Sequence, residues 1–374
     1  MKIEVSKNNL KTGLSIVEKI IGKNITLPIL DNVLISTENN FLLLTATDLE
    51  TAIKYWVLAK ISKEGKVVVP ARFLSSFISL LPEEKILIEE KKQNLSIECK
   101  NYKTQLQGFN PEDFPLIPEI KNQESLVVDN KRFCMGLGQI VDIASLSQAR
   151  PEISGVYLLF SKDSLKIVAT DSFRLAEKTI AIENKDKKDY SFILPQKSAK
   201  EIINALGDKE GVLKICFATN QTLFELPMEG VKHPQIQVFS RLIEGEYPNY
   251  QEIIPSKFKT NITVKKDDFL NHIKTAALFS GKINEIKFII NPAKKSLEIL
   301  AKNPDIGEST STLLAKIDGE PMEVSFNHKF LTDGILNIKS AEIMLSLSGE
   351  GGPCILKPVG DISYLYVVMP IKSV

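Results

Sequence analysis

Two Thr-Asp pairs, Thr47-Asp48 and Thr170-Asp171, are the most conspicuous candidates for chemistry in this sequence. Two carboxylates brought together could act as a general acid and a general base. Both aspartates, however, stand at the same place in a repeated pattern, directly after an alternating apolar run. An aspartate at the end of a strand commonly accepts hydrogen bonds from the backbone of the following turn. The recurrence therefore favours a structural turn over a catalytic pair.

Other signatures of catalysis and metal binding are absent from the sequence. It contains no phosphate-binding loop, zinc-protease motif, nucleophile elbow or dinucleotide fingerprint. Its histidines, His233, His272 and His328, stand at non-equivalent positions, which favours surface or capping roles. Its four cysteines are far apart and form no C-x-x-C or Cys/His cluster, which argues against a zinc site or a disulfide framework. We expect no catalytic residue, no metal and no cofactor.

Composition points to an ordinary globular protein. The chain has 374 residues, of which 43% are hydrophobic and 25% charged, so it is long enough for several buried cores. The N-terminus lacks the apolar core of a signal peptide, and no run reaches the roughly 18 apolar residues of a membrane span. We expect a cytoplasmic protein that makes no membrane contact.

The sequence repeats itself around the two aspartates. The stretch that ends at Asp171 has a near-twin ending at Asp48, and a weaker third copy ends at Asn303. A proline lies 20 residues before each aspartate, at Pro28 and Pro151. An internal repeat largely determines architecture, so it takes precedence over local patterns. These spacings predict three consecutive repeats of roughly 120 residues, each long enough to form a domain.

The limits of the repeats follow from a closing signature. An acidic residue, an aromatic residue and a proline end the first repeat at 113–115 and the second at 246–248. Polar stretches without a clear pattern follow at 119–125 and 256–259, as expected of linkers. The expected domains are 1–121, 126–255 and 256–374.

The same elements are expected in each repeat. An amphipathic helix comes first, two alternating runs joined by a polar turn form a hairpin, and a second helix and further strands follow. This order predicts an α+β fold of three repeated domains, each with two helices packed on antiparallel sheets. The expected helices lie within 6–23, 70–82, 129–145, 195–207, 264–282 and 327–338. The expected hairpins are 32–36 with 41–48, 155–160 with 165–171, and 287–290 with 297–303.

Charge is unevenly distributed between these elements. The six helical windows contain 14 Lys or Arg and 7 Asp or Glu, whereas the whole chain has 47 and 46. Such segregation makes the helical surface positive and the remainder repulsive to a polyanion. It indicates sequence-independent contact with a phosphate backbone. The alternative interpretation is a set of solvated amphipathic helices with a chance excess of lysine.

Five motifs occur in chain order and together resemble the bacterial DNA polymerase III β-subunit family, the sliding clamps. They are TLPILDN at 26–32, ATDLE at 46–50, ATDSFRLA at 169–176, YPNY at 247–250 and YVVMP at 366–370. The resemblance covers the whole chain. It implies a head-to-tail homodimer that closes into a ring, with helices lining the central hole and sheets outside. It also implies a processivity factor rather than an enzyme.

The resemblance further implies partners and sites. Double-stranded DNA would pass through the ring, held without sequence preference by Lys23, Arg72, Arg150, Lys197 and Lys200. The DNA polymerase III α subunit, the clamp loader and other proteins with a clamp-binding motif would dock in a groove. The groove residues would be Ile153, Thr170, Ser172, Phe173, Arg174, Leu175, Pro248, Ile253, Val367, Met369 and Pro370. Thr104, Leu106, Leu278 and Phe279 would form the dimer interface.

This chain departs from the family pattern at the groove. Ser172 and Phe173 stand where Gly-His is frequent, and Glu252 stands where arginine is found in some members. The chain ends in IKSV at 371–374, where Met-Arg-Leu is common. We therefore expect a bulkier and less basic groove rim.

Two other functions compete with the clamp. One is a non-ring nucleic-acid-binding scaffold, and the other is an enzyme with an unrecognised site. Measuring the mass in solution separates ring from scaffold, because the ring requires a stable dimer.

Overall fold

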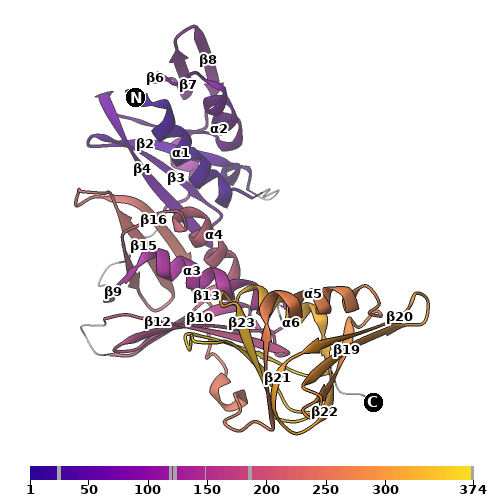
Figure 1. Cartoon of the computed structure of the whole chain (residues 1–374). Coiled ribbons are helices and arrows are strands. Elements are labelled where there is room, and N and C mark those ends of the chain that lie inside the picture. The colour runs from indigo at the N-terminus through magenta and orange to yellow at the C-terminus, as the bar shows by residue number, and fades with distance from the viewer. Residues whose placement is uncertain (23–26, 118–119, 121–123, 148, 184–187, 372–374) are drawn as a thin grey trace. The chain divides into compact units, whose positions relative to one another are not determined.

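The computed structural model describes residues 1–22, 27–117, 120, 124–147, 149–183 and 188–371. Each repeat contains two α-helices and a series of antiparallel strands (Figure 1). The first repeat comprises β1 Lys2–Ser6, α1 Lys7–Val17, β2 Asn32–Glu38, β3 Phe41–Thr47, β4 Thr51–Lys63, β5 Lys66–Pro70, α2 Ala71–Leu80, β6 Lys85–Lys91, β7 Asn94–Cys99 and β8 Tyr102–Gln107.

The second and third repeats follow the same order of elements. The second comprises β9 Glu124–Asp129, α3 Asn130–Ile140, β10 Gly155–Phe160, β11 Ser164–Thr170, β12 Arg174–Ala181, β13 Tyr190–Pro195, α4 Gln196–Leu206, β14 Val212–Phe217, β15 Gln221–Pro227 and β16 Pro234–Arg241. The third comprises β17 Thr260–Lys265, α5 Lys266–Ala277, β18 Glu285–Asn291, β19 Ser296–Asn303, β20 Gly307–Leu314, β21 Lys316–Gly319, β22 Met322–Asn327, α6 His328–Leu336, β23 Glu342–Leu347, β24 Cys354–Pro358 and β25 Tyr364–Val368.

The predicted α+β fold with two helices in each repeat is confirmed for the described residues. Two details differ. The first helices of the first two repeats are shorter than expected, because short 3₁₀ turns continue them at Glu18–Ile20 and Val141–Ile143. Pro70 and Pro195 are the final residues of β5 and β13 and cap α2 and α4 from outside. The expected windows 70–82 and 195–207 instead begin at these prolines, which would place them in the first helical turn, where a missing N–H is equally harmless.

Two of the three sheets cross from one repeat to the next. The twelve-stranded sheet has the strand order β8-β7-β6-β1-β4-β16-β15-β14-β9, with β2, β3 and β5 beside this path. Its crossing point is the antiparallel pair β4 and β16. The nine-stranded sheet has the order β13-β10-β11-β12-β25-β24-β23-β17-β21 and crosses at β12 and β25. The third sheet is β20-β19-β18-β22. Hydrogen-bonded strands thus connect successive repeats.

The chain forms two compact units that follow the sheets more closely than the repeats. Unit 1 comprises Met1–Gly138, Ile182–Lys188 and Leu194–Ile243, and unit 2 comprises Gln139–Ala181, Asp189–Ile193 and Glu244–Val374. Unit 1 contains the twelve-stranded sheet, and unit 2 contains the four-stranded sheet and nearly all of the nine-stranded sheet. The second repeat is therefore divided between the two units.

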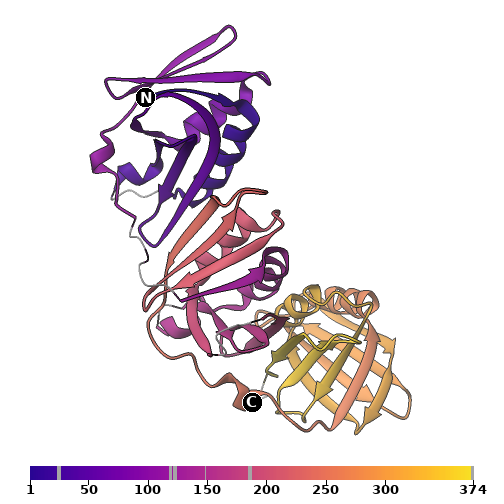
Figure 2. The ribbon, with the colours of Figure 1, turned by 90° about the vertical axis from the view of Figure 1, so that its left-hand side faces the viewer.

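Each unit has its own buried core beneath its helices. In unit 1, α1 packs against α2 and β4, and buries Leu10 and Leu14. In unit 2, α5 packs against α6 and β20 (Figure 2). Its buried face includes Phe269 and Ile273. Full burial of one such side chain stabilises the fold by about 1.5–3 kcal/mol. Within the described residues, no helix is long and apolar enough to cross a membrane.

Candidate binding groove

Residues 170–175 form a tight turn between β11 and β12. The Thr170 hydroxyl donates to the carbonyl of Arg174 at 2.7 Å. The Asp171 carboxylate accepts from the backbone N–H groups of Phe173 and Arg174, both at 3.0 Å. Ser172 between them has a φ of +79°, in the left-handed region. The predicted structural role of Asp171 is thereby confirmed, because its carboxylate is engaged by the turn.

The Arg174 side chain is enclosed by acidic and aromatic groups. Its Nε donates to Asp171 at 2.9 Å, and Nη1 donates to Asp333 on α6. The guanidinium also lies 4.6 Å from the centre of the Phe330 ring. Burial alone would lower the pKa of Arg174, but interactions with Tyr366, Asp333 and Asp171 outweigh it and raise the pKa. With 11% of its side chain exposed, Arg174 is mainly a structural cation.

The linker after the second repeat is anchored beside this turn. The Tyr250 hydroxyl donates to Glu177 on β12 at 2.5 Å, and the Tyr247 ring stacks on Tyr157 with centroids 4.7 Å apart. Burial, and then the bond to Glu177, raise the pKa of Tyr250. These contacts hold the 3₁₀ turn Tyr250–Ile253 against the sheet. They position the part of the linker that carries Glu252 and Ile253.

Turn, linker and third repeat together surround a groove of about 540 Å³. The structure places eight of the eleven predicted groove residues around it: Thr170, Ser172, Phe173, Arg174, Leu175, Ile253, Val367 and Met369. Ile153, Pro248 and Pro370 do not line it. Leu175 and Val367 face each other on β12 and β25 and belong to a buried apolar cluster that forms the floor. The groove is therefore apolar below and polar at its turn.

Five further lining residues were not among the predicted wall residues. They are Glu252, Pro255, Ser348, Gly352 and Pro353. Glu252 had been identified only as a departure from the family pattern. Residues 348–353 join β23 to β24 and carry no periodic pattern that would indicate their position. The repeat offered one signal. Residues 348–353 occupy the same place in the third repeat as the loop between β14 and β15 occupies in the second.

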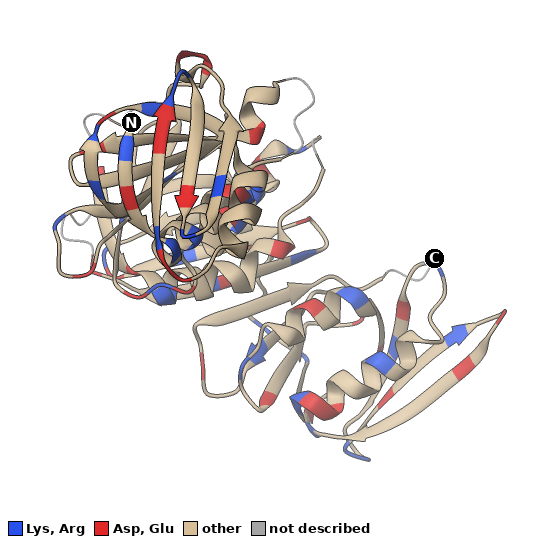
Figure 3. Ribbon diagram, turned by 90° about the horizontal axis from the view of Figure 1, so that it is seen from above, with Lys and Arg blue, Asp and Glu red and all other residues tan. Residues whose placement is uncertain are grey.

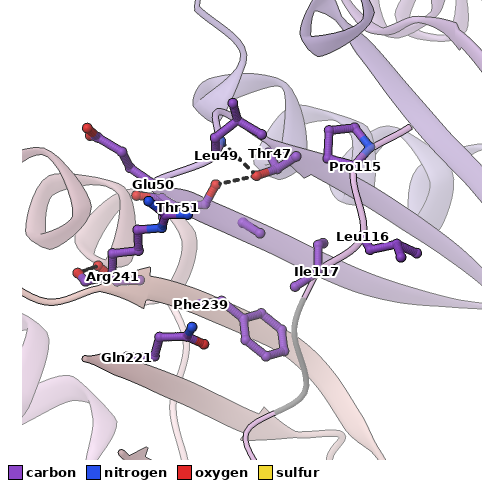
Figure 4. A pocket seen from close by; sticks show the side chains of 12 residues that line it. Thr47, Leu49, Glu50, Thr51, Pro115, Leu116, Ile117, Gln221, Phe239 and Arg241 are labelled. Atoms are coloured by element: carbon purple, nitrogen blue, oxygen red, sulfur yellow. Dashed lines mark hydrogen bonds between the residues drawn. The ribbon is translucent and has the colours of Figure 1, made fainter. Parts of the chain in front are cut away.

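The same backbone arrangement occurs in unit 1, at the end of β3 (Figure 4). Thr47 donates to the carbonyl of Thr51 at 2.9 Å, and Asp48 accepts from the N–H groups of Glu50 and Thr51 at 3.1 and 2.7 Å. Leu49 has a φ of +76°. Arg241 N–H donates to the Glu50 carbonyl at 2.9 Å, and Met369 N–H donates to the Phe173 carbonyl at 2.9 Å. We call residues 47–52 with 115–117 and 239–241 the first seam, and 170–175 with 252–255 and 367–369 the second seam.

The first seam encloses a cavity of only about 120 Å³. Its cross-strand pair is Ala52 and Phe239, where the second seam has Leu175 and Val367. Phe239 and Ile117 line the same small space from the strand and the linker (Figure 4). The large Phe239 ring therefore occupies space that remains open in the second seam.

A second difference is how each turn reaches the following helix. In the first seam Asp48 forms an ion pair with Lys197 on α4, and Thr51 shares a buried hydrogen bond of 2.7 Å with Ser198. Burial alone would lower the pKa of Lys197, but its hydrogen bond with Asp48 and the nearby negative charges raise it. In the second seam Arg174 bridges to α6 instead. Both turns are thus tied to the second helix of the next repeat.

The other predicted site residues are distributed over both units. Arg72 lies on α2 and donates to the Ile21 carbonyl at 2.8 Å, and Lys197 and Lys200 lie on α4. Arg150 bonds to Glu152 at 3.0 Å and to Ser172 at 3.1 Å, which places it beside the groove. Lys23 lies outside the described residues. Figure 3 shows charges of both signs on helices and strands, so the charge segregation is partial.

The predicted interface residues lie on a strand that ends a sheet or directly after a helix. Thr104 and Leu106 are on β8, the terminal strand of the twelve-stranded sheet. Leu278, 71% exposed, and Phe279 directly follow α5. Another terminal strand, β20, packs on α5 and was not predicted as part of an interface.

No group of three or more His, Cys, Asp or Glu residues is placed to hold a metal ion in the described part of the chain. All four cysteines are buried, and burial raises the pKa of the Cys354 thiol to about 12. A buried thiol of this kind stays protonated and is a poor nucleophile.

Comparison with known proteins finds relatives of one family along nearly the whole chain. Family models for the DNA polymerase III beta subunit match in order: the N-terminal domain at residues 1–118, the central domain at 128–249 and the C-terminal domain at 251–372. The beta sliding clamp of Bacillus subtilis is 28% identical over 385 residues, covering all of both chains. That of Synechococcus elongatus is 26% identical over 379 residues, covering all of this chain and 99% of the relative.

Solved structures agree with the sequence matches. The crystal structure of the DNA polymerase sliding clamp from Bacillus subtilis superposes with a TM-score of 0.93 at 27% identity, covering all of both chains. The DNA polymerase III beta subunit from Thermotoga maritima gives 0.92 at 26% identity, again over both full chains.

The three-repeat architecture and the sheets shared between repeats define a clamp fold. Clamps of this kind are processivity factors and not catalysts. The chain belongs to the DNA polymerase III beta-subunit family, the bacterial beta sliding clamps.

Proposed function

We propose that this protein is the DNA sliding clamp of a replicative polymerase. Two copies form a closed ring around duplex DNA, and partner proteins dock in the groove of the second seam. The continuation of sheets from repeat to repeat, with suitable terminal strands left over, is the observation that carries this proposal. No observation favours the alternative of a non-ring scaffold.

Ring closure follows from the pattern of strand pairing. The last strand of the second repeat, β16, pairs with β4, and the last strand of the third, β25, pairs with β12. The last strand of the first repeat, β8, is a sheet terminus among the described strands, as is β20, the counterpart of β4 and β12. Pairing of β8 in one copy with β20 in another would repeat the same joint. A two-fold axis would then supply two joints and close the ring.

Leu278 and Phe279 support this arrangement because they follow α5, which packs on β20. With Thr104 and Leu106 on β8 they would form the proposed dimer interface. Each terminal strand presents backbone donors and acceptors that a partner strand can satisfy.

Duplex DNA is the proposed cargo of the ring. Lys23, Arg72, Arg150, Lys197 and Lys200 are proposed to contact the phosphate backbone, supported by the excess of Lys and Arg in the helical windows. Arg150 is the weakest member of this set, because its guanidinium bonds to Glu152 and Ser172. Such contacts carry little sequence information and allow sliding.

The partner proteins are proposed to be the DNA polymerase III α subunit, the clamp loader and other proteins with a clamp-binding motif. The groove offers an apolar floor and a few polar groups, as peptide-binding sites do. The proposed domains remain 1–121, 126–255 and 256–374, and the proposed location is the cytoplasm, where replication takes place.

Retention on DNA tests the ring. The full chain is loaded onto nicked circular DNA by the clamp loader of the same organism, and the complex is passed through a sizing column. We expect the protein to remain with circular DNA and to leave after a single restriction cut. Equal retention on circular and linear DNA would favour the scaffold and overturn the proposal.

A further inference from the structure

Acidic groups outnumber basic ones around the groove. Glu252 lines the groove, and Asp171 and Asp333 contact Arg174, the only cation among the lining residues that the structure describes. Two carboxylates thus contact the one guanidinium, and a third lines the same groove. At the rim, Arg150 and Glu152 pair with each other and add no net charge.

Arg174 is poorly placed to receive an acidic ligand. Its Nε and Nη1 already donate to Asp171 and Asp333, and one side of the guanidinium faces Phe330. An incoming carboxylate would have to approach two existing carboxylates to reach it. Like charges brought this close repel one another, which disfavours acidic ligands here.

Glu252, by contrast, is available to a basic ligand. Its carboxylate accepts one hydrogen bond, from the Asn249 side-chain amide at 2.7 Å, and forms no ion pair among the described residues. It is exposed at the groove wall. A lysine or arginine of a bound peptide could form a charge-assisted hydrogen bond with it.

An aromatic surface adjoins these carboxylates. Phe173 is 62% exposed and lines the groove, and its ring lies 6.4 Å from that of Phe330 at an interplanar angle of 24°. The Arg174 guanidinium already lies over the Phe330 ring. The exposed face of Phe173 offers a second cation the same kind of contact, which operates within about 6 Å of a ring centre.

We infer that this groove selects peptides in which a lysine or arginine stands next to the apolar residues that occupy its floor. This inference rests on the proposed function, because it names the chemistry of the partner that the groove receives. Glu252 and Phe173 are the residues that determine the preference.

Three labelled peptides test the inference by fluorescence anisotropy. They share one apolar pair and differ only in the neighbouring residue, which is arginine, glutamine or glutamate. We expect affinity to fall in that order, with arginine roughly tenfold over glutamate at low salt, as expected for charges near a solvated surface. The difference should shrink as salt is added, because exposed charges are screened.

Two substitutions identify the source of the preference. Glu252→Gln should reduce the ratio of arginine to glutamate affinity, whereas Glu229→Gln, at an exposed glutamate outside the groove lining, should leave it unchanged. Equal affinities for all three peptides, or preference for glutamate, would overturn the inference and leave the groove as a peptide site. Failure of all three to bind the unmodified protein, or binding insensitive to Met369→Ala, would overturn the proposed groove function itself.

Discussion

The two seams share one backbone arrangement and differ in what their side chains leave open. In each, a threonine and an aspartate organise the turn, and the following strand pairs with the last strand of the next repeat. The first seam has Ala52 opposite Phe239 and the second has Leu175 opposite Val367. The cavity is about 120 Å³ in one and 540 Å³ in the other. The repeat therefore determines the joint, and a few side chains determine whether that joint can receive a ligand.

The ion pairs that link each turn to the following helix also differ between the two seams. Asp48 reaches Lys197, whose side chain is 57% exposed, whereas Asp171 holds Arg174, 11% exposed, against Asp333. Arg174 thus links the turn of the open groove to α6 through a largely buried guanidinium.

The largest effect is expected at the proposed joint between two copies, where β8 of one copy would pair with β20 of the other. Leu278→Ala combined with Phe279→Ala removes two large side chains from the proposed interface, at a cost of about 2–5 kcal/mol for each one buried. The same damage occurs at both joints of the ring. Sedimentation should show dissociation to monomers at nanomolar concentration, and a persistent dimer would count against this joint.

Removing the turn aspartates should destabilise the protein to different extents in the two internal seams. Asp171→Ala deletes two backbone hydrogen bonds and leaves Arg174 without one partner, at a cost of about 3 kcal/mol. Asp48→Ala deletes two similar bonds, but its ion pair with half-exposed Lys197 is screened and adds little, so about 2 kcal/mol is expected. Urea unfolding of both variants measures the difference. An equal or reversed order would show that Arg174 does not stabilise the second seam.

Equivalent residues in the two seams should respond differently to partner peptides. Met369→Ala should weaken binding by at least about 1 kcal/mol, as truncation of a central apolar contact usually does. Arg241→Ala, at the matching position of the first seam, is the control and should leave affinity unchanged. Calorimetry with an apolar peptide from a replicative polymerase provides the measurement. Loss of affinity in the control instead would move the binding site to unit 1.

The smallest effect is expected where both seams carry backbone strain. Leu49 and Ser172 have φ values of +76° and +79°, which glycine adopts without steric cost. Leu49→Gly and Ser172→Gly should each change the free energy of unfolding by less than about 1 kcal/mol, because relief of strain is offset by greater entropy of the unfolded chain. Thermal unfolding of the pair checks this. A loss of several kcal/mol would mean that these side chains, rather than the backbone, maintain the turns.

Much of this architecture could be predicted because the same pattern of helices and strands occurs three times in the sequence. Period-two runs predicted β2, β3, β10 and β11 to within two residues, since alternation directly reflects one buried face. The turn role of Asp48 and Asp171 followed from their recurrence. The division into two compact units could not be predicted from the repeats, because it depends on which strands pair across the seams.

The groove was predictable where it is built from the turn and from β25. Its far wall, at Ser348, Gly352 and Pro353, comes from a loop without periodicity. The engagement of Arg174 by Asp333 was also missed, since a contact across 159 residues leaves no local pattern. The resemblance implied only that Arg174 belongs to the groove wall, and its two carboxylate partners limit the contact that it can make with a peptide.

The number of peptides bound per chain tests the central contrast most directly. If only the second seam is open, titration calorimetry of the unmodified protein with an apolar partner peptide should give one peptide per chain, and Met369→Ala should weaken that single event. Two equivalent peptides per chain, or one that persists unchanged in the variant, would contradict the account.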